Sequence, residues 1–292
     1  MNKLTVEKRT QILSMLVEGS SMRSISRITG VSINTVTKLL VDAGAVCAKF
    51  HDEAVMGVKA KRIQCDEIWS FCYAKAKNVP TAVAAPEEAG DVWTWTALDS
   101  DSKLIVSYLV GGRDSGYALE FMDDVRARVE GRIQLTTDGH RAYLEAVEDA
   151  FGGDVDYAQL IKMYGPAPEG QRRYSPAKCN GSYAKHVTGR PDYDHVNTSY
   201  VERQNLTMRM SMRRFTRLTN GFSKKIENHI HMLSLYFVHY NFCRIHKTLK
   251  VTPAMEAGLS DTCRDMEWIV GLIDAAAPAP AKRGPYKKNN SN

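Results

Sequence analysis

Apolar residues near the start of the chain recur at helical spacing and predict three short helices. The first ends near Gly19, the second covers residues 22–29, and the third begins at Ser32 and is expected to end at Gly44. Two short helices joined by a tight turn that contains glycine form the helix-turn-helix pattern. The chain is therefore expected to begin with a helix-turn-helix domain.

In that pattern the second helix of the pair enters the major groove and turns its first residues toward the base edges. The residues in this position are polar and can donate or accept hydrogen bonds: Ser32, Asn34, Thr35 and Lys38. The alternative is a three-helix packing module without DNA contact. DNA contact is favoured because no acidic residue occurs between Glu18 and Asp42.

Further along the chain the pattern changes to strands and helices. Strands are expected at 62–71, 92–98, 104–110, 133–136 and 155–161, with helices at 119–129 and 142–150. Three sequential strands followed by alternating helices and strands predict a mixed α/β sheet.

The last part of the chain is less regular. Four prolines and four glycines between 164 and 195 predict an irregular basic insertion, after which helices are expected at 198–215 and 224–241. The final residues are basic, of low complexity and expected to be disordered. The predicted organisation is a helix-turn-helix domain at 1–48, a linker at 49–61, a catalytic domain at 62–272 with the insertion at 164–195, and a tail at 273–292.

The chain has 292 residues, 43% of them hydrophobic and 25% charged, which excludes a disordered or collagen-like protein. The net charge of +6 is unevenly spread, with +5 over 1–64, −7 over 65–201 and +8 over 202–292. Basic ends around an acidic centre indicate a protein that binds a polyanion. No apolar stretch is long enough to span a membrane, so no membrane partner is expected.

Three acidic residues are predicted to meet in the sheet. Asp66 lies within the first strand, Asp138 follows the fourth, and Glu202 lies in the first turns of the next helix. Because side chains alternate along a strand, Asp66 and Glu67 are expected to point to opposite faces, so only one of them can serve this site. Hard cations prefer carboxylate oxygens, and two Mg²⁺ ions support phosphodiester cleavage. The prediction is a site for two Mg²⁺ ions, with Mn²⁺ as an alternative.

The helix that carries Glu202 continues into a segment, 203–225, with seven basic and no acidic residues. Arg209 follows Glu202 by two helical turns and projects from the same face. This segment is expected to contact DNA phosphates through Arg203, Arg209, Arg213 and Arg214. The alternative is a solvated basic face that complements the acidic centre.

Four motifs together carry a resemblance to a known family: QCDEIWSF, LTTDGHRAY, NTSYVERQNLTMRM and YNFCRIHKTL followed by TP. They resemble the insertion-sequence-one family of DDE transposases over nearly the whole chain. The resemblance implies a ribonuclease-H-like catalytic domain with helices on both faces of its sheet and Asp66, Asp138 and Glu202 as the catalytic triad. It also places Asn205, Arg244, His246 and Lys247 near the DNA.

The function implied is a transposase that binds the terminal inverted repeats of an insertion sequence, cleaves DNA there and transfers the strand to a target. Double-stranded DNA is the expected partner, a homo-oligomer the expected assembly, and the bacterial cytoplasm, at the nucleoid, the expected location. Relatives often carry a zinc module before the helix-turn-helix, but no cysteine precedes Cys47, so no zinc is expected. The alternatives are a catalytically inactive DNA-binding regulator derived from a transposase and a cellular structure-specific nuclease.

Overall fold

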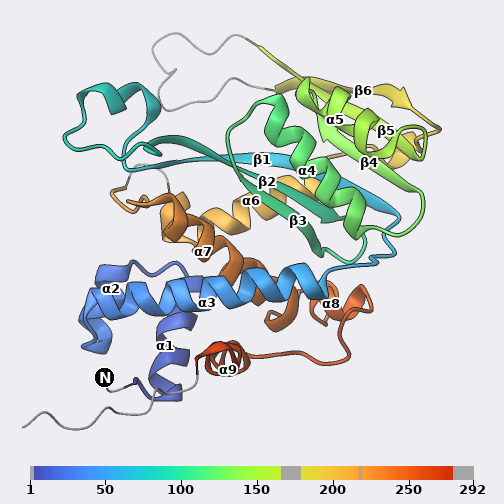
Figure 1. Ribbon diagram of the computed structural model, residues 1–292. Helices are drawn as coiled ribbons and strands as arrows, with labels where there is room; N and C mark the ends of the chain where they lie inside the picture. The colour runs from blue at the N-terminus through green and yellow to red at the C-terminus, as the bar shows by residue number, and fades with distance from the viewer. Residues whose placement is uncertain (1–2, 166–178, 217–218, 279–292) are drawn as a thin grey trace, which may run out of the picture.

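Six strands form one sheet in the computed structural model, which describes residues 3–165, 179–216 and 219–278 (Figure 1). The order across the sheet is β3-β2-β1-β4-β5-β6. The strands are β1 Arg62–Cys72, β2 Gly90–Asp99, β3 Ile105–Gly111, β4 Ile133–Asp138, β5 Val155–Tyr164 and β6 Cys179–Thr188.

Strands β1, β2 and β3 form an antiparallel meander, whereas β4 lies parallel to β1 and β5 lies parallel to β4. Helix α4 Ser115–Arg128 joins β3 to β4 and helix α5 Ala142–Phe151 joins β4 to β5, as the alternation of helices and strands in the sequence predicts. The ladder between β1 and β4 ends at the pair Cys65 and Thr137. The next residue of each strand, Asp66 and Asp138, stands where the two strands separate.

Helices cover both faces of the sheet, which confirms the predicted mixed α/β arrangement. On one face Trp95 of β2 packs its ring edge against Tyr143 of α5 and lies close to Phe121 of α4. On the opposite face Gln64 of β1 holds the first turn of α6 Ser199–Ser211. The site described below lies at the end of β4, between these two helical layers.

Three helices precede the sheet: α1 Val6–Val17, α2 Met22–Thr29 and α3 Ile33–Ala54. Their N-termini are capped by the side chains of Thr5, Ser21 and Ser32, each of which accepts a hydrogen bond from a backbone N–H in the first turn. Helix α3 lies along α7, and both α1 and α3 pack against α9 (Figure 1). The later helices are α7 Ile226–Val238, which ends in a π-helical turn at His239–Cys243, α8 Pro253–Glu256 and α9 Met266–Ala276.

Helix α3 does not end at Gly44 but continues to Ala54, through part of the predicted linker at 49–61. A Cβ atom added at Gly44 would lie 2.3 Å from Cβ of His231 on α7. The glycine therefore serves close packing of two helices rather than a helix end. The division of the chain into domains stays a prediction.

The predicted insertion at 164–195 is partly regular, because residues 179–188 form β6 and pair with β5 in antiparallel register. Its prolines lie outside that strand, so they do not interrupt the ladder. Helix α6 ends at Ser211, earlier than expected, and α9 continues past the predicted start of the tail at 273. Parts of three predicted segments lie outside the described residues: 166–178 of the insertion, Arg217 of the basic segment 203–225, and 279–292 of the tail.

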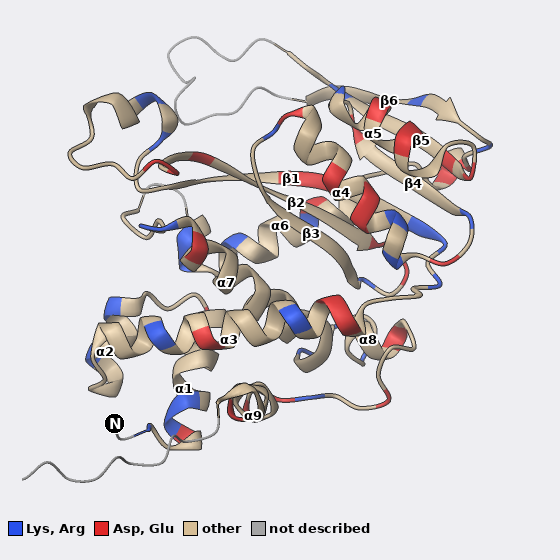
Figure 2. Cartoon of the chain, in the orientation of Figure 1, with Lys and Arg blue, Asp and Glu red and all other residues tan. Residues whose placement is uncertain are grey.

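Acidic side chains interrupt the centre of the sheet. Figure 2 shows one acidic segment on β1, which is the pair Asp66 and Glu67.

Of the helices in the described parts of the chain, none is by itself long and apolar enough to cross a bilayer. Helices α2 and α3 reach that length and composition only as a pair, bent by 117°.

Candidate active site

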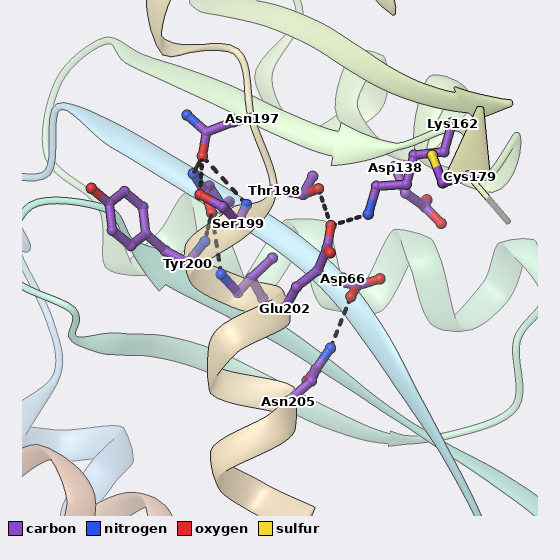
Figure 3. Close-up of polar contacts among 12 residues, drawn as sticks. Asp66, Asp138, Lys162, Cys179, Asn197, Thr198, Ser199, Tyr200, Glu202 and Asn205 are labelled. Carbon is purple, nitrogen blue, oxygen red and sulfur yellow. Dashed lines mark hydrogen bonds and ion pairs between the residues drawn. The ribbon is translucent and has the colours of Figure 1, made fainter. Parts of the chain in front are cut away.

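Three carboxylates from separate elements line one cavity of about 760 Å³. Asp66 comes from the middle of β1, Asp138 from the end of β4 and Glu202 from the first turns of α6 (Figure 3). The three residues predicted to form the triad are thus brought together by strands and a helix that are far apart in the sequence. The cavity is open to solvent on one side, so a large substrate can reach it.

Glu67 belongs to this acidic group as well. One oxygen each from Asp66, Glu67 and Asp138 lies within 4.8 Å of the others. Strand alternation does turn the two side chains to opposite faces, because Asp66 bonds to Asn205 of α6 whereas Glu67 lies beside Tyr143 of α5. Their oxygens still approach Asp138 together, because β1 and β4 separate just after Cys65 and Thr137 and this opening can be reached from both faces of the sheet.

Burial makes this cluster electrostatically costly. Desolvation, together with the charges of Glu67 and Asp138, raises the pKa of Asp66 to about 7. Desolvation and Asp138 also raise the pKa of Glu67, whereas Tyr143 and Arg113 act in the opposite direction. Carboxylates held this close are stabilised when a cation neutralises them.

The donor atoms fit a hard cation. All of them are carboxylate oxygens, the ligands that Mg²⁺ and Mn²⁺ prefer. The cluster can therefore hold a divalent metal.

Each predicted carboxylate is held by a different neighbour, and Figure 3 shows these contacts for Asp66 and Glu202. Asn205 on α6 donates a hydrogen bond from Nδ2 to Oδ2 of Asp66 at 2.8 Å. The backbone N–H of His140 donates to Oδ1 of Asp138 at 2.9 Å. Oε1 of Glu202 accepts hydrogen bonds from both the Thr198 hydroxyl and the Lys162 ammonium group. All three side chains are thus fixed before any ligand arrives.

Gln64 sets the position of Glu202 relative to Asp66. Its Oε1 accepts the backbone N–H groups of Tyr200 at 3.0 Å and Val201 at 3.2 Å, in the first turn of α6. Its Nε2 donates to Oδ1 of Asn197 at 2.8 Å. Gln64 is almost fully buried, so these bonds are shielded from water. One side chain of β1 therefore anchors the helix that carries the third carboxylate.

Basic side chains lie beside the carboxylates. Arg113, Arg141 and Lys162 line the same cavity. The acidic cluster and its basic neighbours form one polar surface, in which a metal can be bound next to a phosphate.

The sequence patterns single out neither these cations nor Glu67 and Gln64. The two β1 residues leave a trace, since each is a polar residue in a largely apolar strand. Arg113 follows β3 and Arg141 precedes α5, whereas Lys162 lies within β5, and none of the three stands in a pattern of its own.

The predicted DNA-reading residues of α3 are all exposed. Ser32 also caps the helix by accepting from the backbone N–H of Thr35 at 3.3 Å. Lys38 forms an ion pair with Asp42 one turn later, at 2.8 Å. Asn34 and Thr35 present their side chains to solvent near the start of the helix, where a groove can be reached.

The predicted phosphate contacts beyond Glu202 are divided. Arg203 and Arg213 are exposed and Arg209 is half-buried, whereas Asn205 is buried against Asp66. Arg214 donates to Oγ of Ser223 at 3.1 Å and to the carbonyl oxygen of Asn228, and burial lowers its pKa to about 10. Arg214 thus ties the end of α6 to the start of α7, which is a structural contact.

The last predicted cluster follows the π-helical turn. Arg244 and Lys247 are exposed and His246 is half-buried. Burial and the positive charges of Lys103 and Arg244 lower the pKa of His246. The cluster therefore forms a basic surface with Lys103 of the β2–β3 turn, and these four residues are not among those that line the carboxylate cavity.

No protein-family model matches this chain, and no curated protein sequence matches it. Among solved structures it is similar to a piggyBac transposase synaptic complex with hairpin DNA, at 11% identity and a TM-score of 0.41, over 94% of this chain and 73% of that one. It is also similar to the Mos1 mariner paired-end complex with Mn, at 12% identity and a TM-score of 0.25, over 81% and 76% of the two chains. A third similar structure is the Mos1 transposase paired-end complex with the left transposon end, at 12% identity and a TM-score of 0.22. The match covers 54% of this chain and 60% of that chain. Similarity this slight supports no inference about activity.

Proposed function

We propose that this protein is a metal-dependent DNA strand-transfer enzyme, a DDE transposase. The observation that carries the proposal is the cavity in which Asp66, Asp138 and Glu202 converge beside Arg113, Arg141 and Lys162. Phosphodiester chemistry requires both parts of this arrangement, carboxylates for a divalent metal and cations for the phosphate backbone.

The strand order supports a ribonuclease-H-like catalytic domain. An antiparallel meander is followed by two strands parallel to its first member, and the carboxylates lie on the two central strands, β1 and β4. This is the arrangement that the resemblance to the insertion-sequence-one family leads us to expect.

Asp66, Asp138 and Glu202 would hold Mg²⁺ or Mn²⁺, and the metal would supply Lewis-acid chemistry for phosphodiester cleavage. The chain's own residues perform the remaining tasks. Asn205 keeps the Asp66 carboxylate turned toward the cavity, and Gln64 fixes the helix that carries Glu202. Arg141 and Lys162 provide positive charge for the bound strand. The same cavity serves the cut and the later attack of the 3′-hydroxyl on a target.

The proposed recognition of the element ends rests on α2 and α3. These helices are bent by 117° across a three-residue turn in which Gly30 adopts the left-handed conformation. A helix-turn-helix joins its two helices at a similar angle through a short turn containing glycine. Helix α3 would enter the major groove with Asn34 and Thr35 facing the bases. Arg203, Arg213, Arg244 and Lys247 would add contacts to phosphates.

Two element ends have to be joined in one event, and the described part of each chain has one carboxylate cavity. The active form is therefore proposed to be a homo-oligomer on double-stranded DNA.

The test is a cleavage assay on duplexes taken from either side of the reading frame of this protein. We expect the full chain with Mg²⁺ to nick one strand, leave a 3′-hydroxyl and join it to a second plasmid. Asp138→Asn should lower cleavage at least about 1,000-fold, because a metal ligand is lost, while the DNA affinity in a gel-shift assay stays the same. Asp123→Asn, which changes an exposed carboxylate on α4, is the control and should keep full activity.

A wild-type chain that binds these duplexes but cuts none of them with Mg²⁺ or Mn²⁺ would contradict the proposal. That result would favour the catalytically inactive regulator. Equal cutting of all duplexes, whatever their sequence, would favour a structure-specific nuclease.

A further inference from the structure

Arg113 is held at the edge of the carboxylate cavity by three neighbours. It lies between β3 and α4, and its Nε donates to Oε2 of Glu67 at 3.0 Å. Its guanidinium carbon lies 4.7 Å from the centroid of the Trp93 ring. Its Nη2 lies 3.6 Å from Oδ2 of Asp138. An arginine stacked on an indole and bonded through Nε has little rotational freedom left.

The free end of this guanidinium is directed at the cavity. Neither Nη group of Arg113 donates a hydrogen bond to any residue in the described chain, and the approach to Asp138 is too long for one. The side chain is 34% exposed, whereas that of Glu67 is only 1% exposed. Arg113 thus presents both Nη groups beside the carboxylates without a hydrogen bond to the described residues, and Nη2 makes only a long ion pair with Asp138.

Glu67 has a position that is hard to explain by stability alone. A buried carboxylate next to Asp66 and Asp138 is repelled by both, and it is tolerated only with a well-placed partner. Arg113 is the one cation that forms an ion pair with Glu67 within the described residues. The cost of this buried charge is understandable if the pair serves to hold the guanidinium in place.

We propose that Arg113 is a phosphate-binding residue of the cavity and that Glu67 is the positioning residue that orients it. The ligand is a phosphodiester group of the DNA strand that lies over the carboxylates. A planar guanidinium offers two parallel N–H groups to two phosphate oxygens, and here the stacking on Trp93 fixes their plane. This inference rests on the proposed function, because it supplies a contact to the same substrate.

A different role for Arg113 has different consequences. If it only neutralised Glu67 and Asp138, its removal would change the metal concentration needed for cleavage and leave DNA contacts as they were. If it binds phosphate, its removal releases one fewer counterion on DNA binding, which makes the affinity less dependent on salt. Salt dependence therefore separates the two roles.

The experiment compares Arg113→Ala, Arg113→Lys and Glu67→Gln with the control Arg126→Ala. Arg126 makes the same kinds of contact outside the cavity, an ion pair with Asp154 at 3.5 Å and a position over the Phe151 ring at 5.7 Å. DNA affinity is measured against KCl concentration with Ca²⁺, which carboxylates also bind, and gels verify that the duplex stays intact. Cleavage is then measured against Mg²⁺ concentration, and thermal unfolding verifies that each variant is folded.

We expect Arg113→Ala to lower kcat about 100-fold and to reduce the slope of log affinity against log salt by about one. The Mg²⁺ concentration for half-maximal cleavage should not change. Arg113→Lys should recover the salt slope but stay at least about tenfold slower, since an ammonium group cannot bind two oxygens in one plane. The kcat and the salt slope of Glu67→Gln should lie between those of Arg113→Ala and the wild type. Both values for Arg126→Ala should match the wild type.

An unchanged salt slope in Arg113→Ala would overturn the inference while the proposed function stands. A changed Mg²⁺ requirement in Glu67→Gln with an unchanged salt slope would make Glu67 a metal ligand and overturn its positioning role. If the wild type does not cleave at all, the proposed function fails, and the salt slopes still decide whether Arg113 contacts phosphate.

Discussion

In the carboxylate cavity, Asp66 accepts a hydrogen bond from Asn205, Glu202 is held by Thr198 and Lys162, and Gln64 ties the helix behind them to the sheet. At the start of α3, Asn34 and Thr35 are exposed, and among the predicted DNA-reading residues, all of them described, only Lys38 forms an ion pair, with its helix neighbour Asp42. The first region is ordered before it meets a ligand. The second can adjust its side chains when it meets one. This difference suits a catalytic site on one hand and a DNA-reading surface on the other.

The comparison is sharpest at Gln64, where one side chain sets the geometry of the cavity. Gln64→Leu should lower the cleavage rate about 100-fold. The backbone N–H groups of Tyr200 and Val201 lose their common acceptor, so the start of α6 and Glu202 with it should shift. DNA affinity should stay within about twofold of the wild type. Cleavage kinetics with gel-shift measurements would check both values.

Gln134 on β4 offers a matched control for that substitution. Its amide makes the same kinds of bond, because it donates to the carbonyl oxygen of Asp192 at 3.0 Å and accepts the N–H of Asp192 at 2.9 Å, and Asp192 lies outside α6. If Gln64→Leu and Gln134→Leu lower cleavage equally, the anchoring role of Gln64 is wrong.

A smaller effect is expected at the exposed region. Asn34→Ala should weaken binding about tenfold to a duplex that the wild type selects from a randomised pool, because a base contact is lost. Binding to unselected DNA and the cleavage rate at saturating DNA should not change. Fluorescence anisotropy measures both affinities, and Lys49→Ala near the other end of α3 is the control. Equal weakening on both kinds of DNA would turn the expected base contact into a contact with the backbone.

The smallest effect concerns stability and pH. The pKa of Asp66 is raised from 3.8 to about 7 in the folded chain, so between these values the folded state binds more protons than the unfolded state. Stability without metal should therefore fall as the pH rises from 4 toward 7. Asp66→Asn should remove this dependence and raise Tm at pH 8 by about 2–4 °C for each kcal/mol recovered. Saturating Mg²⁺ should stabilise the wild type more than the variant in calorimetry, and a lower Tm for the variant would contradict this account.

The periodic segments were predictable from sequence because side-chain alternation and helical spacing reflect local burial. The order of strands and helices from β1 to β5, and the convergence of Asp66, Asp138 and Glu202, follow from such patterns and from the family resemblance. Gly44 was misinterpreted because a glycine that ends a helix and one that admits a neighbouring helix look alike until His231 is placed against it. Glu67 was left out of the site because it points to the opposite face from Asp66, and the sequence does not show that the separation of β1 and β4 lets the two carboxylates approach Asp138 from both faces. The role of Arg113 depends on three contacts from distant segments and leaves no pattern in its own neighbourhood.

The continuity of α3 sets a length scale. Its first turn carries Asn34, while near its other end His51 donates to the carbonyl oxygen of Ile105 at 3.3 Å and Arg128 donates to that of Val55 at 3.3 Å. A helix of 22 residues spans about 33 Å, close to the length of ten DNA base pairs. If α3 reads DNA as proposed, its length would set the distance between the bases that are read and the β3 and α4 segments that its other end contacts. Adding or removing one residue within α3 would rotate the proposed reading face by about 100° relative to that end.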